Sequence, residues 1–198
     1  MNYYISDLHL FSKNQTKQGK NFDDRPFDTV QDMNDAILKN WNSVVTNGDT
    51  VYILGDISNR GKNEDLFALV ARLKGKKVLI SGNHDDVTDY RYKQLFYAIY
   101  DYLELTDYAD KAAYRLVLSH YPILFWNGQH RGTILLYGHT HKSIEDAYFQ
   151  KCISEMNNLD FSIRREHEKE IKAINVGCMM PYMDYTPRTL NEILLNPR

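Results

Sequence analysis

The sequence predicts an α/β domain in which some strands pair in parallel and others in antiparallel fashion. In the first half of the chain, short apolar runs alternate with stretches of helical periodicity, as in a parallel sheet with crossover helices. In the second half, strand-like runs follow one another without clear helices between them, which favours antiparallel pairing in part of the structure. Polar side chains follow several of these strands, and such strand ends meet at one edge of a sheet.

The first half contains three predicted strands, each a short apolar or β-favouring run bounded by turn residues. They are expected at residues 2–5, 51–54 and 77–80. Two predicted helices separate them. The first carries apolar residues at helical spacing from Val30 to Trp41, and Asp28 is its predicted N-cap. The second lies at 66–73 and is closed by Gly75 just beyond its end.

The second half is predicted to add further strands and two helices. Strands are expected at residues 102–108, 113–118, 133–137 and 171–176, and helices at 89–100 and around 148–156. The dense mixed charge of residues 164–172 indicates a solvated face. The tail at 181–198 is too short to be a domain, so residues 1–198 are expected to form one domain.

The composition is that of an ordinary globular protein, with a formal net charge of −2 that gives no overall attraction to nucleic acid or to anionic membranes. Cys152 and Cys178 lack metal-type pairing and are interpreted as reduced thiols. The N-terminus enters a strand directly, without the regions of a signal peptide, and no apolar run approaches membrane-spanning length. A cytoplasmic protein without a membrane partner is therefore expected.

Acids, imidazoles and one amide stand where the predicted strands end. They are Asp7 and His9, Asp56, Asn83 and His84, His120, and His139 and His141. Members of the pairs Asp7/His9 and His139/His141 point to one side if the backbone there is extended. Carboxylate and imidazole suit divalent manganese, iron and zinc, and the lack of thiolate argues against a structural zinc site. The set is too large for one tetrahedral ion, but two ions sharing a carboxylate would use it.

The same residues, in this order, resemble the motifs of the calcineurin-like metallophosphoesterases. The motifs are Asp7-Leu8-His9, Gly55-Asp56, Gly82-Asn83-His84-Asp85, Ser119-His120 and Gly138-His139-Thr140-His141. The match covers residues 6–141 and extends to Asn175-Val176-Gly177, which is similar to the family's closing strand. The resemblance implies a four-layer sandwich of two mixed β-sheets flanked by α-helices, with the metals at one edge.

The resemblance also implies the metal ligands. Asp7, His9 and His141 would hold one divalent ion and Asn83, His120 and His139 the other, with Asp56 bridging them. Manganese is favoured, and iron, zinc, nickel or cobalt would suit the same donors. Two ions carry four positive charges and the two aspartates cancel only two, so the cluster stays positive enough to hold a hydroxide and a phosphoryl oxygen.

The implied activity is hydrolysis of small phosphomonoesters or phosphodiesters by in-line attack of a metal-bridging hydroxide. Asn83 and His84 would face the substrate, and His84 would protonate the leaving oxygen as general acid. For Asp85 two alternatives stay open: it orients His84, or it only caps the following turn.

For each of the other candidate residues, both a functional role and an ordinary structural role stay open. Residues 55–61 resemble a stretch of the protein serine/threonine phosphatases in which an arginine contacts phosphate, so Arg60 either does the same or is a surface residue. Asn59 and Asp85 depart from that pattern. His130 lies between two ligand-bearing strands and either lines the substrate site or packs in a loop, as do Tyr121, Trp126 and Arg131. Lys13, Lys17 and Lys20 either face phosphate or belong to a solvated loop.

Three other functions remain possible from the sequence. A nuclease of the same family is less favoured because the chain shows no extended basic track. A protein phosphatase is disfavoured by the two departures named above. A non-catalytic metal-binding scaffold is disfavoured because every ligand and the substrate-facing histidine are present. The oligomeric state is not predicted.

Overall fold

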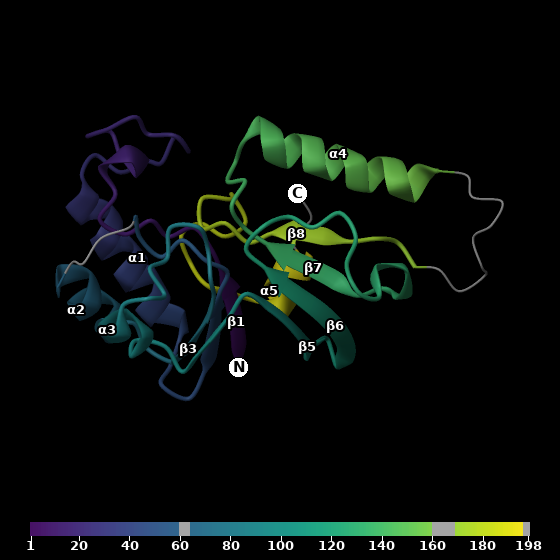
Figure 1. Cartoon of the computed structure of the whole chain (residues 1–198), viewed down its shortest axis with the longest axis horizontal. Coiled ribbons are helices and arrows are strands. Elements are labelled where there is room, and N and C mark those ends of the chain that lie inside the picture. The colour runs from purple at the N-terminus through teal and green to yellow at the C-terminus, as the bar shows by residue number, and fades with distance from the viewer. Residues whose placement is uncertain (60–63, 160–168, 196–198) are drawn as a thin grey trace.

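Two β-sheets flanked by helices form the computed structural model, which describes residues 1–59, 64–159 and 169–195 (Figure 1). The first sheet has the strand order β4-β3-β2-β1-β9 and the second β5-β6-β7-β8. In Figure 1, α1, α2 and α3 lie on the side of the first sheet and α4 on the side of the second. The predicted α/β sandwich of two mixed sheets with flanking helices is confirmed.

The first sheet is parallel except at one edge. Its strands are β1 (Asn2–Ile5), β2 (Thr50–Ile53), β3 (Lys76–Ile80), β4 (Ala98–Tyr100) and β9 (Arg188–Thr189). Neighbours from β1 to β4 pair in parallel, whereas β9 runs antiparallel to β1. The carboxyl ends of β1, β2 and β3 therefore lie at the same edge.

The second sheet is antiparallel only between its first two strands. Its strands are β5 (Tyr102–Ala109), β6 (Ala112–Ser119), β7 (Ile134–Tyr137) and β8 (Ala173–Asn175). β5 and β6 form an antiparallel pair, and β6, β7 and β8 are parallel. Antiparallel pairing in the second half is thus confirmed for β5 and β6. A parallel bridge between Ser6 and Gly177 connects the ends of β1 and β8, so the two sheets meet at their carboxyl edges.

The helices cover the sheets with apolar faces. They are α1 (Val30–Val44), α2 (Glu64–Arg72), α3 (Tyr90–Lys93), α4 (Ile144–Asn158) and α5 (Leu190–Leu195), with short 3-10 turns at Lys13–Gln15 and Gln129–Arg131. Trp41 of α1 is fully buried and donates its indole N–H to Lys74 O at 2.9 Å. In the described part of the chain, no helix combines the length and apolar character needed to cross a membrane.

The N-cap of α1 is Thr29 rather than the predicted Asp28. The Thr29 side chain accepts a hydrogen bond from Asp32 N, and the Asp32 carboxylate accepts one from Thr29 N at 3.1 Å, which makes a capping box. Asp28 instead pairs with Lys17 at 2.7 Å on the surface. The reciprocal pair satisfies two free backbone donors, so the helix starts one residue later than the sequence indicated.

We expect Thr29→Ala to lower the free energy of unfolding by about 1 kcal/mol, because the first turn of α1 loses its cap. Asp28→Ala is the matched control and should change it by less than about 0.5 kcal/mol, since a surface ion pair contributes little. The difference is measured by urea denaturation, and the comparison holds when the two variants have the same m value. A larger loss of stability for Asp28→Ala than for Thr29→Ala would show that Asp28, and not Thr29, is the N-cap of α1.

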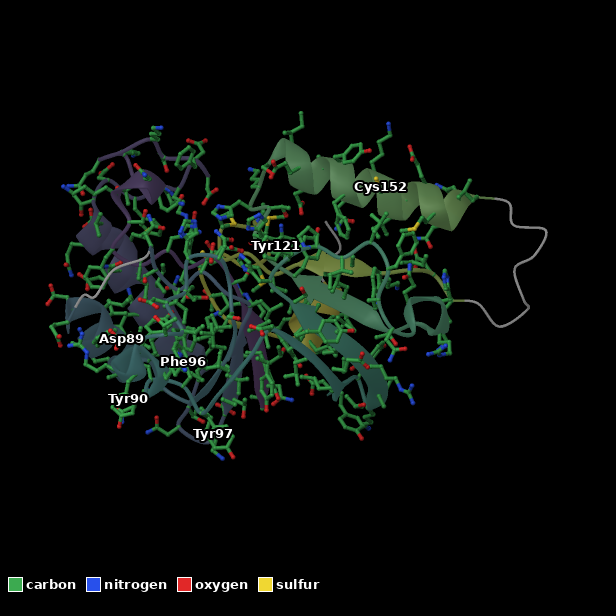
Figure 2. All side chains as sticks on the ribbon, in the orientation of Figure 1. Asp89, Tyr90, Phe96, Tyr97, Tyr121 and Cys152 are labelled. Carbon is green, nitrogen blue, oxygen red and sulfur yellow. The ribbon has the colours of Figure 1, made fainter. Side chains whose placement is uncertain are left out.

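The predicted helix at 89–100 is wrong beyond Lys93, because the chain then adds a strand. Ala98–Tyr100 forms β4 and pairs in parallel with β3. Tyr92 and Phe96 are still buried, as the helical pattern implied, and Figure 2 shows Tyr97 at the outside of the molecule. The edge of β3 offers backbone groups that need partners, and this tertiary pairing outweighs local helix propensity.

The tail contributes more than the sequence indicated. Arg188–Thr189 form β9 beside β1, and Leu190 and Ile193 of α5 are buried. A two-residue strand has no periodicity, so the sequence pattern gave no signal for it.

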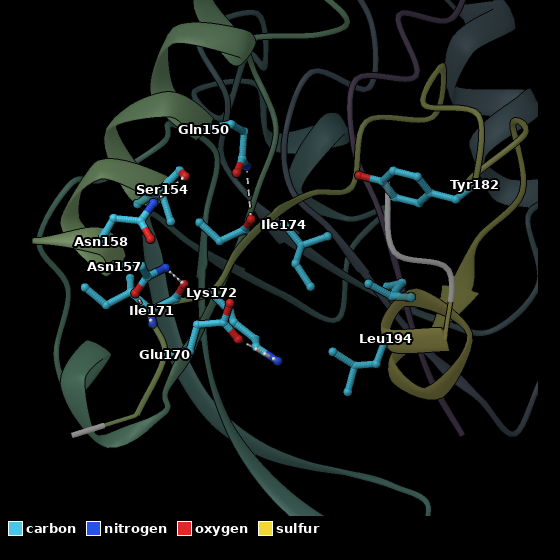
Figure 3. Close-up of a pocket in the computed structure, with 13 residues that line it drawn as sticks. Gln150, Ser154, Asn157, Asn158, Glu170, Ile171, Lys172, Ile174, Tyr182 and Leu194 are labelled. Atoms are coloured by element: carbon cyan, nitrogen blue, oxygen red, sulfur yellow. Dashed lines mark hydrogen bonds and ion pairs between the residues drawn. The ribbon is translucent and has the colours of Figure 1, made fainter. Parts of the chain in front are cut away.

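A pocket of about 500 Å³ lies between α4, β8 and α5 (Figure 3). Asn157 of α4 exchanges two hydrogen bonds with the backbone of Ile171, and Gln150 donates to Ala173 O at 3.0 Å. These amides pair with backbone groups along the outer edge of β8. None of the candidate metal ligands lines this pocket.

Candidate metal centre

The predicted ligands meet at the carboxyl edge where the two sheets join. Asp7 and His9 follow β1, Asp56 follows β2, Asn83 follows β3, His120 follows β6, and His139 and His141 follow β7. The loops are tied together through their backbones, with Asp7 N donating to Gly55 O at 3.1 Å and His9 N to Asp56 O at 2.9 Å. Gly138 N donates to His120 O at 3.0 Å in the second sheet. Parallel strands thus deliver all of these side chains to one place.

A first group consists of Asp7, His9 and His141, whose ligand atoms all lie within 4.8 Å of one another. The Nε2 atoms of His9 and His141 are 3.0 Å apart, and Asp7 Oδ1 is 3.6 Å from His141 Nε2. Three donors of the kind that bind divalent metals therefore face a common point.

A second group consists of Asp56, His120 and His139, with ligand atoms again within 4.8 Å of one another. Asn83 joins it, because its Oδ1 is 3.0 Å from His120 Nε2. Asp56 lies between the groups: its Oδ1 is 3.6 Å from His120 Nε2, and its Oδ2 is 3.7 Å from His9 Nε2. One carboxylate thus presents one oxygen to each group.

The donors fit divalent cations in burial and in protonation. Asp7 and Asp56 are at most 1% exposed, and buried carboxylates call for hydrogen bonds or compensating positive charge. Burial, together with the nearby charges of His141 and Arg25, holds the pKa of His9 well below its usual range. Burial and His120 lower the pKa of His139 as well. Both rings are therefore neutral near pH 7, the form in which imidazole binds a metal.

Hydrogen bonds at the far nitrogen orient three of the imidazoles. His120 Nδ1 lies 2.8 Å from Leu54 O, His141 Nδ1 lies 2.6 Å from Asp23 Oδ1, and His9 Nδ1 lies 3.1 Å from Asn59 Oδ1. Each partner is an acceptor, which favours a proton on Nδ1 and would leave Nε2 to bind a metal ion.

The backbone that presents the ligands is left-handed rather than extended, which corrects the sequence argument. Asp7, His9, Asp56, His139 and His141 have φ values of 55°, 46°, 54°, 68° and 51°. Non-glycine residues adopt this region at a cost of about 1–3 kcal/mol each, and such residues cluster at functional sites. The turns direct both members of each pair to the cluster and leave the intervening Leu8 fully buried.

Two motif glycines are required by close approach to the carboxylates. A Cβ on Gly82 would clash with Asp56 Oδ1, and a Cβ on Gly138 would lie 2.6 Å from Asp7 Oδ2. Neither loop could lie as close to its aspartate with a larger residue, so these glycines set the compactness of the cluster.

Asp85 braces two loops instead of contacting the ring of His84. Its carboxylate accepts hydrogen bonds from the backbone N–H groups of Asp56, Ile57 and Gly82 at 2.9, 3.1 and 2.9 Å. It also accepts from the hydroxyl of Tyr92 at 2.6 Å. These contacts differ from both predicted alternatives and give Asp85 a structural role in holding Asp56 beside the loop of Asn83.

His84 and Tyr121 form the accessible rim of the cluster. The side chain of His84 is 41% exposed, with Nε2 4.0 Å from Asp56 Oδ2, and its backbone N–H donates to Asp56 Oδ1 at 2.9 Å. The ring of Tyr121 lies 4.4 Å from that of His139, and Figure 2 shows Tyr121 near the middle of the molecule. His84 can therefore meet a molecule that enters from solvent.

Several other predicted site residues lie elsewhere. His130 is exposed at the amino end of β7, opposite to His139, and its carbonyl accepts from Lys169 N at 2.9 Å, so its expected contact with substrate has no support in this placement. Trp126 is buried and donates to Thr133 O, which is ordinary loop packing. Arg60 lies outside the described residues. Lys13, Lys17 and Lys20 are exposed.

Sequence reasoning missed Asp23 and Arg25. Arg25 is completely buried, and Asp23 contacts His141 directly. Burial opposes a charge on His141, but the hydrogen bond to Asp23 and the charge of Asp7 outweigh it and raise the pKa of His141. The two residues end a polar loop, and nothing in their spacing distinguishes them from a solvated Asp-x-Arg pair.

Comparison with known proteins agrees with this arrangement. A sequence model of the family described as calcineurin-like phosphoesterase matches residues 3–178. An uncharacterized protein of Methanocaldococcus jannaschii, MJ1445, is 33% identical over 147 residues, which cover 74% of this chain and 72% of that protein. The Gene 66 protein of Mycobacterium phage L5 is 28% identical over 70% of this chain and 76% of its own length. The crystal structure of AQ665 from Aquifex aeolicus, a protein of unknown function, has the same fold, with a TM-score of 0.64, 24% identity and 98% coverage of both chains.

Proposed function

This chain belongs to the calcineurin-like phosphoesterases, a family of metal-dependent enzymes that cleave phosphoester bonds, and we propose that it hydrolyses small phosphate esters with two divalent ions. The observation that carries the proposal is the position of Asp56. Its Oδ1 faces the group of His120 and its Oδ2 faces His9, as a shared ligand of two ions would. The substrate would be a phosphomonoester or a phosphodiester.

Each ion would have its own set of donors. Asp7, His9 and His141 would hold one ion, Asn83, His120 and His139 the other, and Asp56 both. We favour manganese, and iron, zinc, nickel and cobalt suit the same carboxylate and imidazole donors. When bound, such ions activate water and act as Lewis acids toward phosphoryl oxygens. With only two carboxylates among the donors, the loaded cluster keeps a net positive charge that attracts phosphate.

His84 would supply the proton to the leaving oxygen. Its ring stands at the exposed rim, so one nitrogen can face the substrate while the ring packs edge-on against His9 at a centroid distance of 5.4 Å. A positioned histidine with access to both solvent and substrate is suited to general acid catalysis near neutral pH. Asn83 would share the task of binding the phosphoryl group through its neutral amide.

Nucleic acid is a less favoured substrate. The net charge of −2 and the exposed lysines of the loop before α1, of which Lys17 is paired with Asp28, do not amount to an extended basic track. A small ester needs only the positive charge of the metal centre, which this cluster would supply.

The proposal is tested with purified protein stripped of metal and then loaded with manganese, nickel, cobalt, zinc or iron. A phosphomonoester, a phosphodiester and single-stranded DNA are offered as substrates, and bound metal is measured at the same time. We expect two equivalents of metal and metal-dependent release of phosphate or alcohol from one of the small esters. Activity that survives complete chelation would contradict the proposal, and metal binding without turnover of any ester would favour a scaffold.

A further inference from the structure

The segment that precedes α1 reaches into the metal centre through two side chains that have no place in the ligand set. Asp23 is 3% exposed in its side chain and Arg25 is not exposed at all. Asp23 Oδ1 lies 2.6 Å from His141 Nδ1, and its Oδ2 accepts from Arg25 Nε and Nη2 at 3.1 and 3.0 Å. One carboxylate thus joins a metal-binding imidazole to a buried guanidinium.

Arg25 in turn grips the backbone beneath the other ligands of the first group. Its Nη2 donates to Asp7 O at 2.9 Å and its Nη1 to Leu8 O at 3.0 Å. The turn that carries Arg25 is closed by Asn21, whose side-chain Oδ1 accepts from Arg25 N at 2.9 Å and whose Nδ2 donates to Arg25 O at 3.1 Å. The planar guanidinium of Arg25 donates to the Asp23 carboxylate and to the carbonyls of Asp7 and Leu8 at the same time, which a lysine could not do.

The two groups of ligands differ in this outer support. In the second group, His120 Nδ1 faces a neutral carbonyl, Leu54 O, at 2.8 Å. In the first, His141 faces a carboxylate, and a carboxylate partner makes an imidazole both better oriented and a stronger donor. The imidazole of His141 in the first group is therefore supported by a charged carboxylate, whereas that of His120 in the second group faces a neutral carbonyl.

We propose that Asp23 and Arg25 form an outer bracket of the first metal position, in which Asp23 orients and strengthens His141 and Arg25 holds Asp23 and the Asp7–Leu8 backbone in place. The inference rests on the proposed function, because it assumes that the first group binds an ion. Asp23 is a positioning residue: it acts through His141 and touches neither substrate nor metal.

The test compares metal binding by three variants of the full chain, measured by calorimetric titration of the metal-free protein with Mn²⁺ at pH 8. Asp23→Ala removes the acceptor, and Asp23→Asn keeps an acceptor oxygen without the charge. Asp28→Asn is the matched control, since this carboxylate belongs to the same segment but is 75% exposed and pairs with Lys17 on the surface. We expect Asp23→Ala to raise the Kd of one of the two equivalents about 10–100-fold and to leave the other unchanged. Asp23→Asn should show a smaller rise, and Asp28→Asn none.

A double-mutant cycle separates positioning from a general structural role. If Asp23 acts through His141, then Asp23→Ala should not weaken metal binding any further in a His141→Ala background. In a His120→Ala background it should weaken metal binding by its full amount. The urea midpoint of the metal-free Asp23→Ala protein is expected to fall, because the buried Arg25 loses its carboxylate partner, so the assignment rests on which of the two equivalents weakens.

Three results would overturn the inference, and they are distinguishable. Unchanged affinity of both equivalents in Asp23→Ala would show that the bracket does not support the metal. Equal weakening of both equivalents would assign Asp23 a purely structural role. Failure of the wild-type protein to bind two equivalents would remove the proposed function itself and this inference with it.

Discussion

Asp56→Asn is expected to lower kcat/KM for metal-dependent ester hydrolysis by about 1,000-fold or more. The carboxylate presents one oxygen to each ligand group, with Oδ1 3.6 Å from His120 Nε2 and Oδ2 3.7 Å from His9 Nε2. An asparagine has the same shape but no charge, and it would turn an N–H₂ group toward one of the two ligand groups. A thousandfold loss corresponds to about 4 kcal/mol of transition-state stabilisation. The measurement is steady-state kinetics at saturating metal, with metal content determined on the same sample.

Asp35→Asn is the matched control for that variant, because it makes the same chemical change on the exposed face of α1. It should leave both kinetics and metal content unchanged. If Asp56→Asn hydrolyses phosphate esters at the wild-type rate with metal added, Asp56 is not a shared ligand and the proposed mechanism is wrong.

His84→Asn is expected to lower kcat by about 10²–10⁴-fold for alkyl phosphate esters, whose leaving oxygen needs a proton. Nitrophenyl esters should lose much less, because their leaving group departs as a stable anion. Metal content should stay the same, since the His84 ring lies at the rim with 41% of its side chain exposed. The measurement is the ratio of kcat for the two ester types in wild type and variant.

His130→Asn serves as the control for the loss of an exposed imidazole, because His130 lies at the opposite end of β7 from the cluster. It should change neither ester's kcat. An equal loss for alkyl and nitrophenyl esters in His84→Asn would exclude proton donation and leave His84 a binding role only. Loss of metal in that variant would make it a ligand instead.

The sequence by itself determined the sheet strands that carry chemistry and the residues at their ends. Each of these strands is a short apolar run followed by a turn and a polar cluster, and this local pattern survives any arrangement of the rest of the chain. Since parallel strands end at a common edge, the pattern of the first half predicted that Asp7, Asp56 and Asn83 come together. For the histidines of the second half the prediction rested on the family resemblance. The family resemblance rested on the same residues, and it is confirmed by the match over residues 3–178.

Only the tertiary structure decided how those residues are held. Residues 98–100 became a strand because the open edge of β3 needed a partner, although their spacing favoured a helix. The left-handed backbone at Asp7 and His139 depends on contacts between loops, such as the hydrogen bond from His139 N to Asp7 Oδ1 at 3.1 Å. Asp23 reaches His141 across more than a hundred residues of sequence. A local pattern reports propensity and periodicity, whereas partners distant in sequence are chosen by packing around the assembled cluster.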